Sequence, residues 1–175
     1  MKQPLPTGEF RWMEESEFES LRQRLINIPA DNPIGYVLEV DLRYPTDLHD
    51  KHNDYPLAPE RVKITKDMLS DYCRSFFTDR PYVADEKLVP NLMDKVKYVV
   101  HYRNLQLYQE LGLEVKKIHR VLEFRQAPWL AGYIDLNTAM RQQASSEFEK
   151  DFFKLANNSV YGGLKYYLLT ELLAF

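Results

Sequence analysis

The sequence predicts an α+β protein, on three observations. Stretches rich in valine, isoleucine and tyrosine, typical of strands, stand at residues 34–41, 96–102 and 114–124. Stretches with apolar residues at helical spacing lie among them, as at 14–27 and 103–112. Hydrophobic residues make up 45% of the 175-residue chain, which is enough for a packed core. Strands and helices therefore mix along the chain, without an internal repeat or an obvious linker.

The first half of the chain alternates helix, strand and loop. Residues 14–27 have the apolar spacing of an amphipathic helix, with acidic residues in its first turn. Residues 34–41 (IGYVLEVD) are typical of a largely buried strand. Three prolines predict a loop over residues 44–59, and a short helix is expected near 66–77.

The second half has longer regular elements. Residues 96–102 (VKYVVHY) favour a strand, and 103–112 favour a helix that ends at its final glycine. Residues 114–124 alternate as a strand does. The longest helix is predicted from about 135 to 161 and is expected to stop at Gly162-Gly163.

Composition and charge exclude several classes of protein. The net charge of −3 predicts no nucleic-acid binding from overall electrostatics, so any basic surface must be local. The single cysteine, Cys73, excludes an internal disulfide and is typical of a reducing environment. No apolar run approaches the ~20 residues of a membrane span, and the first ten residues lack the apolar core of a signal peptide. We therefore expect an intracellular protein that is neither secreted nor inserted in a membrane.

Three polar side chains share one side of the last predicted helix. At about 100° per residue, Lys154, Asn158 and Tyr161 fall within a sector of roughly 60°. A lysine there is suited to phosphate oxygens, and a tyrosine to a base or sugar. An ordinary amphipathic surface helix has the same spacing, so periodicity alone leaves both interpretations open. The residues expected on the opposite, anchoring face are Phe148, Phe152, Leu155, Ala156 and Val160.

The text K-L-A-N-N-S-V-Y-G, at residues 154–162, fits the pattern K-x-x-x-N-S-x-Y-G. This pattern is the fingers signature of family B DNA-directed DNA polymerases, which the chain resembles. In that family the lysine contacts the phosphates of the incoming nucleotide, and the asparagine and tyrosine line the pocket of the nascent base pair. The resemblance implies these roles for Lys154, Asn158 and Tyr161.

A second basic residue falls close to a position where the family often contacts phosphate. It is Arg141, thirteen positions before Lys154. On one unbroken helix the two side chains would point roughly 140° apart. They can converge on one triphosphate only if the helix breaks, for which Ser145-Ser146 is the candidate point.

The end of the first predicted strand resembles another polymerase motif. It reads E-V-D-L-R-Y-P (39–45), where the first palm motif of the family reads D-x-x-S-L-Y-P. The resemblance implies that Tyr44 packs beneath the nucleotide sugar. The metal-binding acid falls on Asp41, which we prefer as the shorter ligand at the end of the strand, or on Glu39, which a gapless alignment selects. The serine-leucine pair of the family is absent.

The order and spacing of the two motifs, about 110 residues apart, most resemble the protein-primed branch of family B. This branch serves viruses, organellar plasmids and transposons. The resemblance implies a partial polymerase palm with an inserted, priming-protein subdomain and fingers helices. The expected divisions are an N-terminal segment (1–33), the palm strand and loop (34–59), the inserted subdomain (60–125), the fingers (126–163) and a divergent tail (164–175).

The resemblance implies nucleotidyl transfer from dNTP to a primer end, with Mg²⁺ or Mn²⁺ in the complete enzyme. Expected partners are primer-template DNA, dNTP and a priming protein. A second carboxylate motif, D-T-D, does not occur in this sequence. We therefore expect a polymerase fragment that is inactive alone. The alternatives are a non-catalytic module that binds DNA or a protein through residues 60–125, and a degenerate gene product without a function.

Two further groups of polar residues have open interpretations. The run D-L-H-D-K-H-N-D (47–54) suggests either a metal site or a hydrogen-bonded loop, and its spacing favours the loop. His119, Arg120 and Arg125 lie on a predicted strand, where they would contact nucleic-acid phosphate or form an ordinary solvated face.

Overall fold

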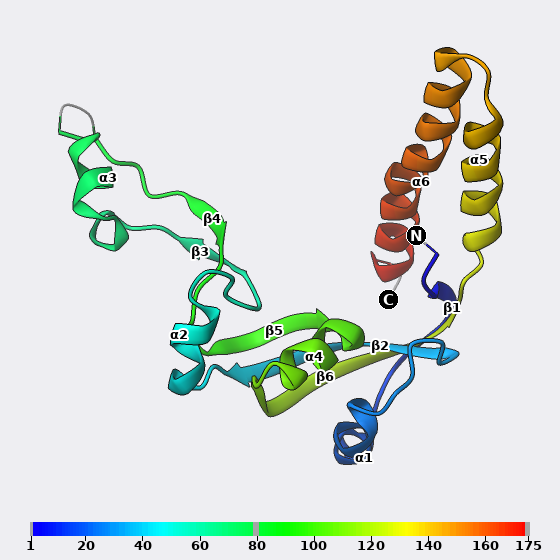
Figure 1. Ribbon diagram of the computed structural model, residues 1–175. Helices are drawn as coiled ribbons and strands as arrows, with labels where there is room; N and C mark the ends of the chain where they lie inside the picture. Colours follow the sequence, from blue (N-terminus) through cyan, green and yellow to red (C-terminus); the bar gives the residue numbers. More distant parts are fainter. Residues whose placement is uncertain (1, 79–80, 174–175) are drawn as a thin grey trace. The chain divides into compact units, whose positions relative to one another are not determined.

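The computed structural model describes residues 2–78 and 81–173, with side chains as far as residue 160 (Figure 1). It confirms a mixed α+β fold. The chain divides into two compact units. The hairpin unit comprises Met1–Glu9, Pro29–Gly35 and Phe124–Phe175. The sheet unit comprises Phe10–Ile28 and Tyr36–Glu123.

A four-stranded sheet in the order β1-β6-β2-β5 is the main β element. Its strands, in this order, are β1 (Leu5–Trp12), β6 (Glu114–Ala127), β2 (Ile34–Arg43) and β5 (Lys95–His101). The three predicted strands are confirmed as β2, β5 and β6. Strand β1 was not predicted, because its proline and glycine are typical of loops.

Two predicted helices are confirmed in the sheet unit. They are α1 (Glu15–Leu25) and α4 (Tyr102–Glu110). The amide of buried Gln106 on α4 donates to the carbonyls of Leu25 and Ile28, at 2.6 and 2.9 Å, and so ties α4 to the end of α1. The core of this unit contains buried side chains of both helices and of the strands: Leu21, Leu25, Leu38, Val40, Leu42, Tyr102, Leu105 and Val121.

Short elements connect β2 to β5. The predicted loop after β2 contains a 3-10 turn (Thr46–Leu48) and the one-turn helix α2 (His49–His52). The predicted short helix is a second 3-10 turn (Lys66–Met68) followed by α3 (Asp71–Ser75). Strands β3 (Glu60–Lys63) and β4 (Glu86–Val89) pair antiparallel in a separate sheet. Neither of these two strands was predicted.

The predicted inserted subdomain, 60–125, contains both the β3–β4 sheet and the strands β5 and β6. Because β5 and β6 are the direct neighbours of β2, the second part of this segment lies in the same sheet as the strand of the first motif. The division of the chain into polymerase subdomains stays a prediction.

The predicted single helix from about 135 to 161 is wrong in both its start and its end. Two helices, α5 (Ala131–Gln143) and α6 (Glu147–Leu173), pack side by side (Figure 1). They are separated at Ser145-Ser146, the candidate point for a break. The Oγ of Ser146 accepts from the N–H of Glu149 at 3.2 Å, and the Glu149 carboxylate accepts from the N–H of Ser146 at 3.3 Å. This reciprocal capping box starts α6.

The prediction that this helix stops at Gly162-Gly163 is wrong. Helix α6 continues to Leu173. Glycine disfavours a helix by only ~1 kcal/mol per residue and adopts helical dihedral angles readily. The leucine, tyrosine, lysine and glutamate residues that follow extend the helix. In the part of the chain that the structure describes, no helix is long and apolar enough to span a membrane.

Candidate functional site

Glu39 and Asp41, the candidate metal ligands, lie on the same face of β2. The alternate residues Leu38, Val40 and Leu42 are buried in the core. Because side chains alternate along a strand, the two carboxylates project from the opposite face. Their side chains are 15% and 27% exposed, respectively, so both are accessible from solvent. The structure therefore brings these two predicted residues together.

Glu39 forms an ion pair with Arg120 of strand β6. The Nε of Arg120 donates to one carboxylate oxygen at 2.7 Å, and a terminal nitrogen donates to the other at 3.4 Å. This two-point geometry is the strong form of arginine–carboxylate pairing. It lowers the pKa of the Glu39 carboxyl and raises the pKa of Arg120. Glu39 is thus fully ionised at neutral pH.

Asp41 is held by the neighbouring strands on both sides of β2. Its Oδ1 accepts from the backbone N–H of Lys97 at 2.8 Å and lies 2.8 Å from Nε2 of His119. The histidine contact has the distance of an ion pair but not the alignment of a hydrogen bond. The Lys97 N–H and then His119 lower the pKa of Asp41.

A β-bulge explains why Lys97 offers its N–H to Asp41. Val40 pairs with Tyr98 and Leu42 with Lys95, so two residues of β5 face Asp41 alone. Lys97 adopts a φ of +51°, a left-handed conformation that non-glycine residues rarely take. The Asp41 carboxylate accepts a hydrogen bond from the backbone N–H of Lys97. This bond stabilises the left-handed conformation of Lys97.

Tyr44 is buried and serves the loop that follows β2. Its hydroxyl lies 2.8 Å from Nδ1 of His52 and accepts from the N–H of Leu57 at 3.2 Å. Its own N–H donates to Asp94 at 2.6 Å. The rings of His49 and His52 both contact the Tyr44 ring edge-on. The role of Tyr44 beneath a nucleotide sugar stays a prediction.

The resemblance implies Mg²⁺ or Mn²⁺ at Asp41, and the described residues do not fit such an ion. Each candidate carboxylate already contacts a cationic or protonatable side chain of the chain itself. Among the side chains that the structure describes, no three histidine, cysteine, aspartate or glutamate residues form a group able to hold a metal. This includes the run 47–54, where the histidines contact Tyr44.

The polar column on α6 is exposed where the structure describes it. Lys154 and Asn158 are both exposed on a continuous helix. The column lies beside the face that packs on α5, where Ala156 accepts from the Tyr133 hydroxyl at 3.2 Å and Asn157 accepts from Asn137 at 3.0 Å. The side chain of Tyr161, the third predicted member, lies outside the described residues.

The predicted anchoring face of this helix is wrong for its three largest residues. Phe148, Phe152 and Leu155 are 81%, 57% and 66% exposed. The other two expected members, Ala156 and Val160, are half-buried, and Asn157 between them also contacts α5. Apolar spacing identifies a possible packing face, but the position of α5 decides which face is covered.

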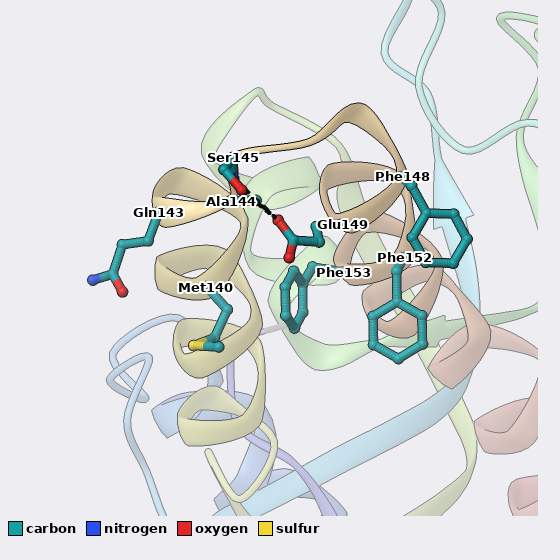
Figure 2. Close-up of a pocket in the computed structure, with 8 residues that line it drawn as sticks. All are labelled: Met140, Gln143, Ala144, Ser145, Phe148, Glu149, Phe152 and Phe153. Atoms are coloured by element: carbon teal, nitrogen blue, oxygen red, sulfur yellow. Dashed lines mark hydrogen bonds between the residues drawn. The ribbon is translucent and has the colours of Figure 1, made fainter.

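An open surface pocket of about 490 Å³ lies at the turn between α5 and α6 (Figure 2). Its lining is mainly apolar, with Met140, Phe148, Phe152 and Phe153 among its residues. The Glu149 carboxylate at its edge accepts from the N–H of Ser145 at 3.0 Å, as Figure 2 shows. Arg141, on the last turn of α5, is exposed. Its convergence with Lys154 on one phosphate group stays a prediction.

The predicted site residues thus form two groups. Glu39, Asp41 and Tyr44 belong to the sheet unit, whereas Arg141, Lys154 and Asn158 belong to the hairpin unit. The sequence does not predict the partners of the carboxylates, because His119 and Arg120 are expected there to contact phosphate or solvent. Only the pairing of β6 with β2 makes them neighbours of Asp41 and Glu39.

Comparisons of the chain with models of protein families, with curated proteins and with solved structures found no match.

Proposed function

We propose that this chain is part of a family B DNA polymerase of the protein-primed branch, and that its α5–α6 hairpin binds the triphosphate of a dNTP. The observation that carries the proposal is the K-x-x-x-N-S-x-Y-G text on an exposed helix. In the complete enzyme, the partners would be primer-template DNA, dNTP and a priming protein, with divalent cations. The reaction would be transfer of a nucleotide to a primer end.

The hairpin geometry supports this role. Helix α6 is held on one side by α5 and leaves Lys154 and Asn158 accessible to solvent. A lysine ammonium binds phosphate through charge-assisted hydrogen bonds, each stronger than a neutral one. The capped break at Ser146 gives this helix a fixed start beside α5. A helix packed against a second helix is a more precise support for a phosphate-binding side chain than a loop.

Removing the lysine tests the proposal. We expect Lys154→Ala to raise the Kd for a fluorescent dATP analogue at least tenfold, measured by anisotropy on the full chain without divalent cations. Losing one hydrogen bond to a charged group costs about 1.5–3 kcal/mol, and about 1.4 kcal/mol is a factor of ten.

Lys87→Ala is the matched control, because Lys87 is an exposed lysine of the sheet unit. Its affinity should equal that of the unchanged chain. Equal binding by all three proteins, or the absence of saturable binding, would contradict the proposal.

The engaged carboxylates disfavour catalysis by the chain alone, which leaves as the second candidate a module that binds DNA or a protein without catalysis. With Glu39 and Asp41 engaged by Arg120 and His119, the 175-residue chain alone should not extend a primer. Binding to primer-template DNA that weakens steeply with salt, and that dATP does not strengthen, would support this second function.

A further inference from the structure

We infer that Arg120, as an internal counter-ion of Glu39, and His119, as a side chain in contact with Asp41, close the Glu39–Asp41 pair to divalent cations. Each side chain lies where a bound cation would neutralise a carboxylate of β2. The inference rests on the proposed function in one respect: that function makes a divalent cation the ligand expected at Asp41. It assigns to two residues of β6 a function that neither motif contains.

Arg120 is held in place from two sides. Its guanidinium forms the two-point contact with Glu39 and also lies over the ring of Trp12, 5.5 Å from the ring centre. The cation–π contact and the ion pair restrict the same flat group. A divalent cation approaching Glu39 must therefore either displace this guanidinium or tolerate its positive charge nearby.

Asp41 has a similar constraint at its Oδ1. That oxygen already binds the N–H of Lys97 and contacts His119. The N–H belongs to the bulged, left-handed Lys97, so rotating the carboxylate away would exchange this hydrogen bond for one to water. Coordination through this oxygen thus competes with both a backbone and a side-chain partner.

The order of strands limits where a further acidic group can approach. Strand β2 has β6 on one side and β5 on the other. Neighbouring strands lie about 4.8 Å apart, so a strand added beyond β5 would lie roughly 10 Å from β2. Among the described strands, only β5 and β6 can therefore place side chains directly beside Glu39 and Asp41.

Binding of Mn²⁺ alone, followed by electron paramagnetic resonance, tests the inference. We expect the unchanged chain to bind Mn²⁺ weakly. The double variant Arg120→Gln/His119→Gln should bind one equivalent at least tenfold more tightly. Adding Glu39→Gln and Asp41→Asn should abolish this gain, which separates the site from other surface acids.

Arg125→Gln is the matched control, because Arg125 on the same strand forms an exposed pair with Glu9 at 2.9 Å. It should leave Mn²⁺ binding unchanged. If the double variant unfolds by circular dichroism, Arg120→Gln alone serves, since this side chain is 63% exposed. Two results would overturn the inference. One is tight binding of Mn²⁺ by the unchanged chain through Glu39 and Asp41. The other is that neither the double variant nor Arg120→Gln binds Mn²⁺ more tightly than the unchanged chain. Because no nucleotide is present, this failure would leave dNTP binding by the α5–α6 hairpin untouched.

Discussion

Glu60→Gln is expected to lower the free energy of unfolding by about 2–3 kcal/mol. Lys95 is almost fully buried, at 1% exposure, and its ammonium lies 2.9 Å from the Glu60 carboxylate. Removing the negative partner of a buried pair leaves an uncompensated charge and costs ~3–5 kcal/mol. The cost should be lower here, because Asn91 oxygens still accept from Lys95. Urea unfolding at pH 7 measures the change.

Replacing the other partner, Lys95, should cost less stability than replacing Glu60. Lys95→Met removes the buried charge and keeps most of the apolar stem, while Glu60, 30% exposed, turns to water. We expect a loss of about 1 kcal/mol or less. Equal losses in the two variants would contradict this account of the pair.

Acid should weaken the same pair. Burial alone raises the pKa of Glu60, but the hydrogen bond from Asn91 and the contact with Lys95 outweigh burial and lower the pKa below its usual 4.5. A lowered folded-state pKa contributes stability above pH 4.5, and this contribution is lost as the pH falls through the folded-state pKa. Glu60→Gln should therefore lose less stability than the unchanged chain on acidification.

Gly35→Ala is expected to destabilise the hairpin unit by about 3 kcal/mol. A Cβ at this position would lie 2.4 Å from the ring of Phe124 and 2.5 Å from the side-chain oxygen of Gln126. Both neighbours are buried, Phe124 at 2% exposure, so neither can move into solvent. Forced repacking of a filled core costs ~1–3 kcal/mol, and two close contacts place this variant at the upper end.

Gly132→Ala is the control of opposite sign. Its Cβ would meet nothing within 4 Å, and it lies in α5. Alanine in place of glycine in a helix favours folding by roughly 0.5–1 kcal/mol. Thermal unfolding should therefore shift downward for Gly35→Ala and upward for Gly132→Ala. A stable Gly35→Ala variant would show that β2 and β6 are not tightly packed here.

Elements with a strong local pattern could be predicted from the sequence. The strands β2, β5 and β6 contain runs of β-branched and aromatic residues, and α1 and α4 have regular apolar spacing. The serine pair before α6 was only a candidate point for a break in the predicted single helix, and it contains the capping box that starts α6. Strand β1 was missed because Pro6 and Gly8 are typical of loops; in the structure Gly8 has a φ of +135°.

Long-range features could not be predicted in this way. Glu39 and Arg120 are 81 residues apart in sequence, and only the strand order brings them together. The packed side of α6 depends on α5, so the exposed Phe148 and Phe152 were wrongly expected to be buried. The motif residues Lys154 and Asn158 were identified by resemblance, which does not specify their surroundings.

Photoaffinity labelling of the full chain with an azido derivative of dATP tests the central claim most directly. Peptide mapping by mass spectrometry then locates the label. We expect it within α6, in peptides near Lys154 and Asn158, with competition by unlabelled dATP and loss of labelling in Lys154→Ala. Labelling confined to the sheet unit, or labelling of α6 that dATP does not compete, would contradict the proposal that this hairpin binds the nucleotide.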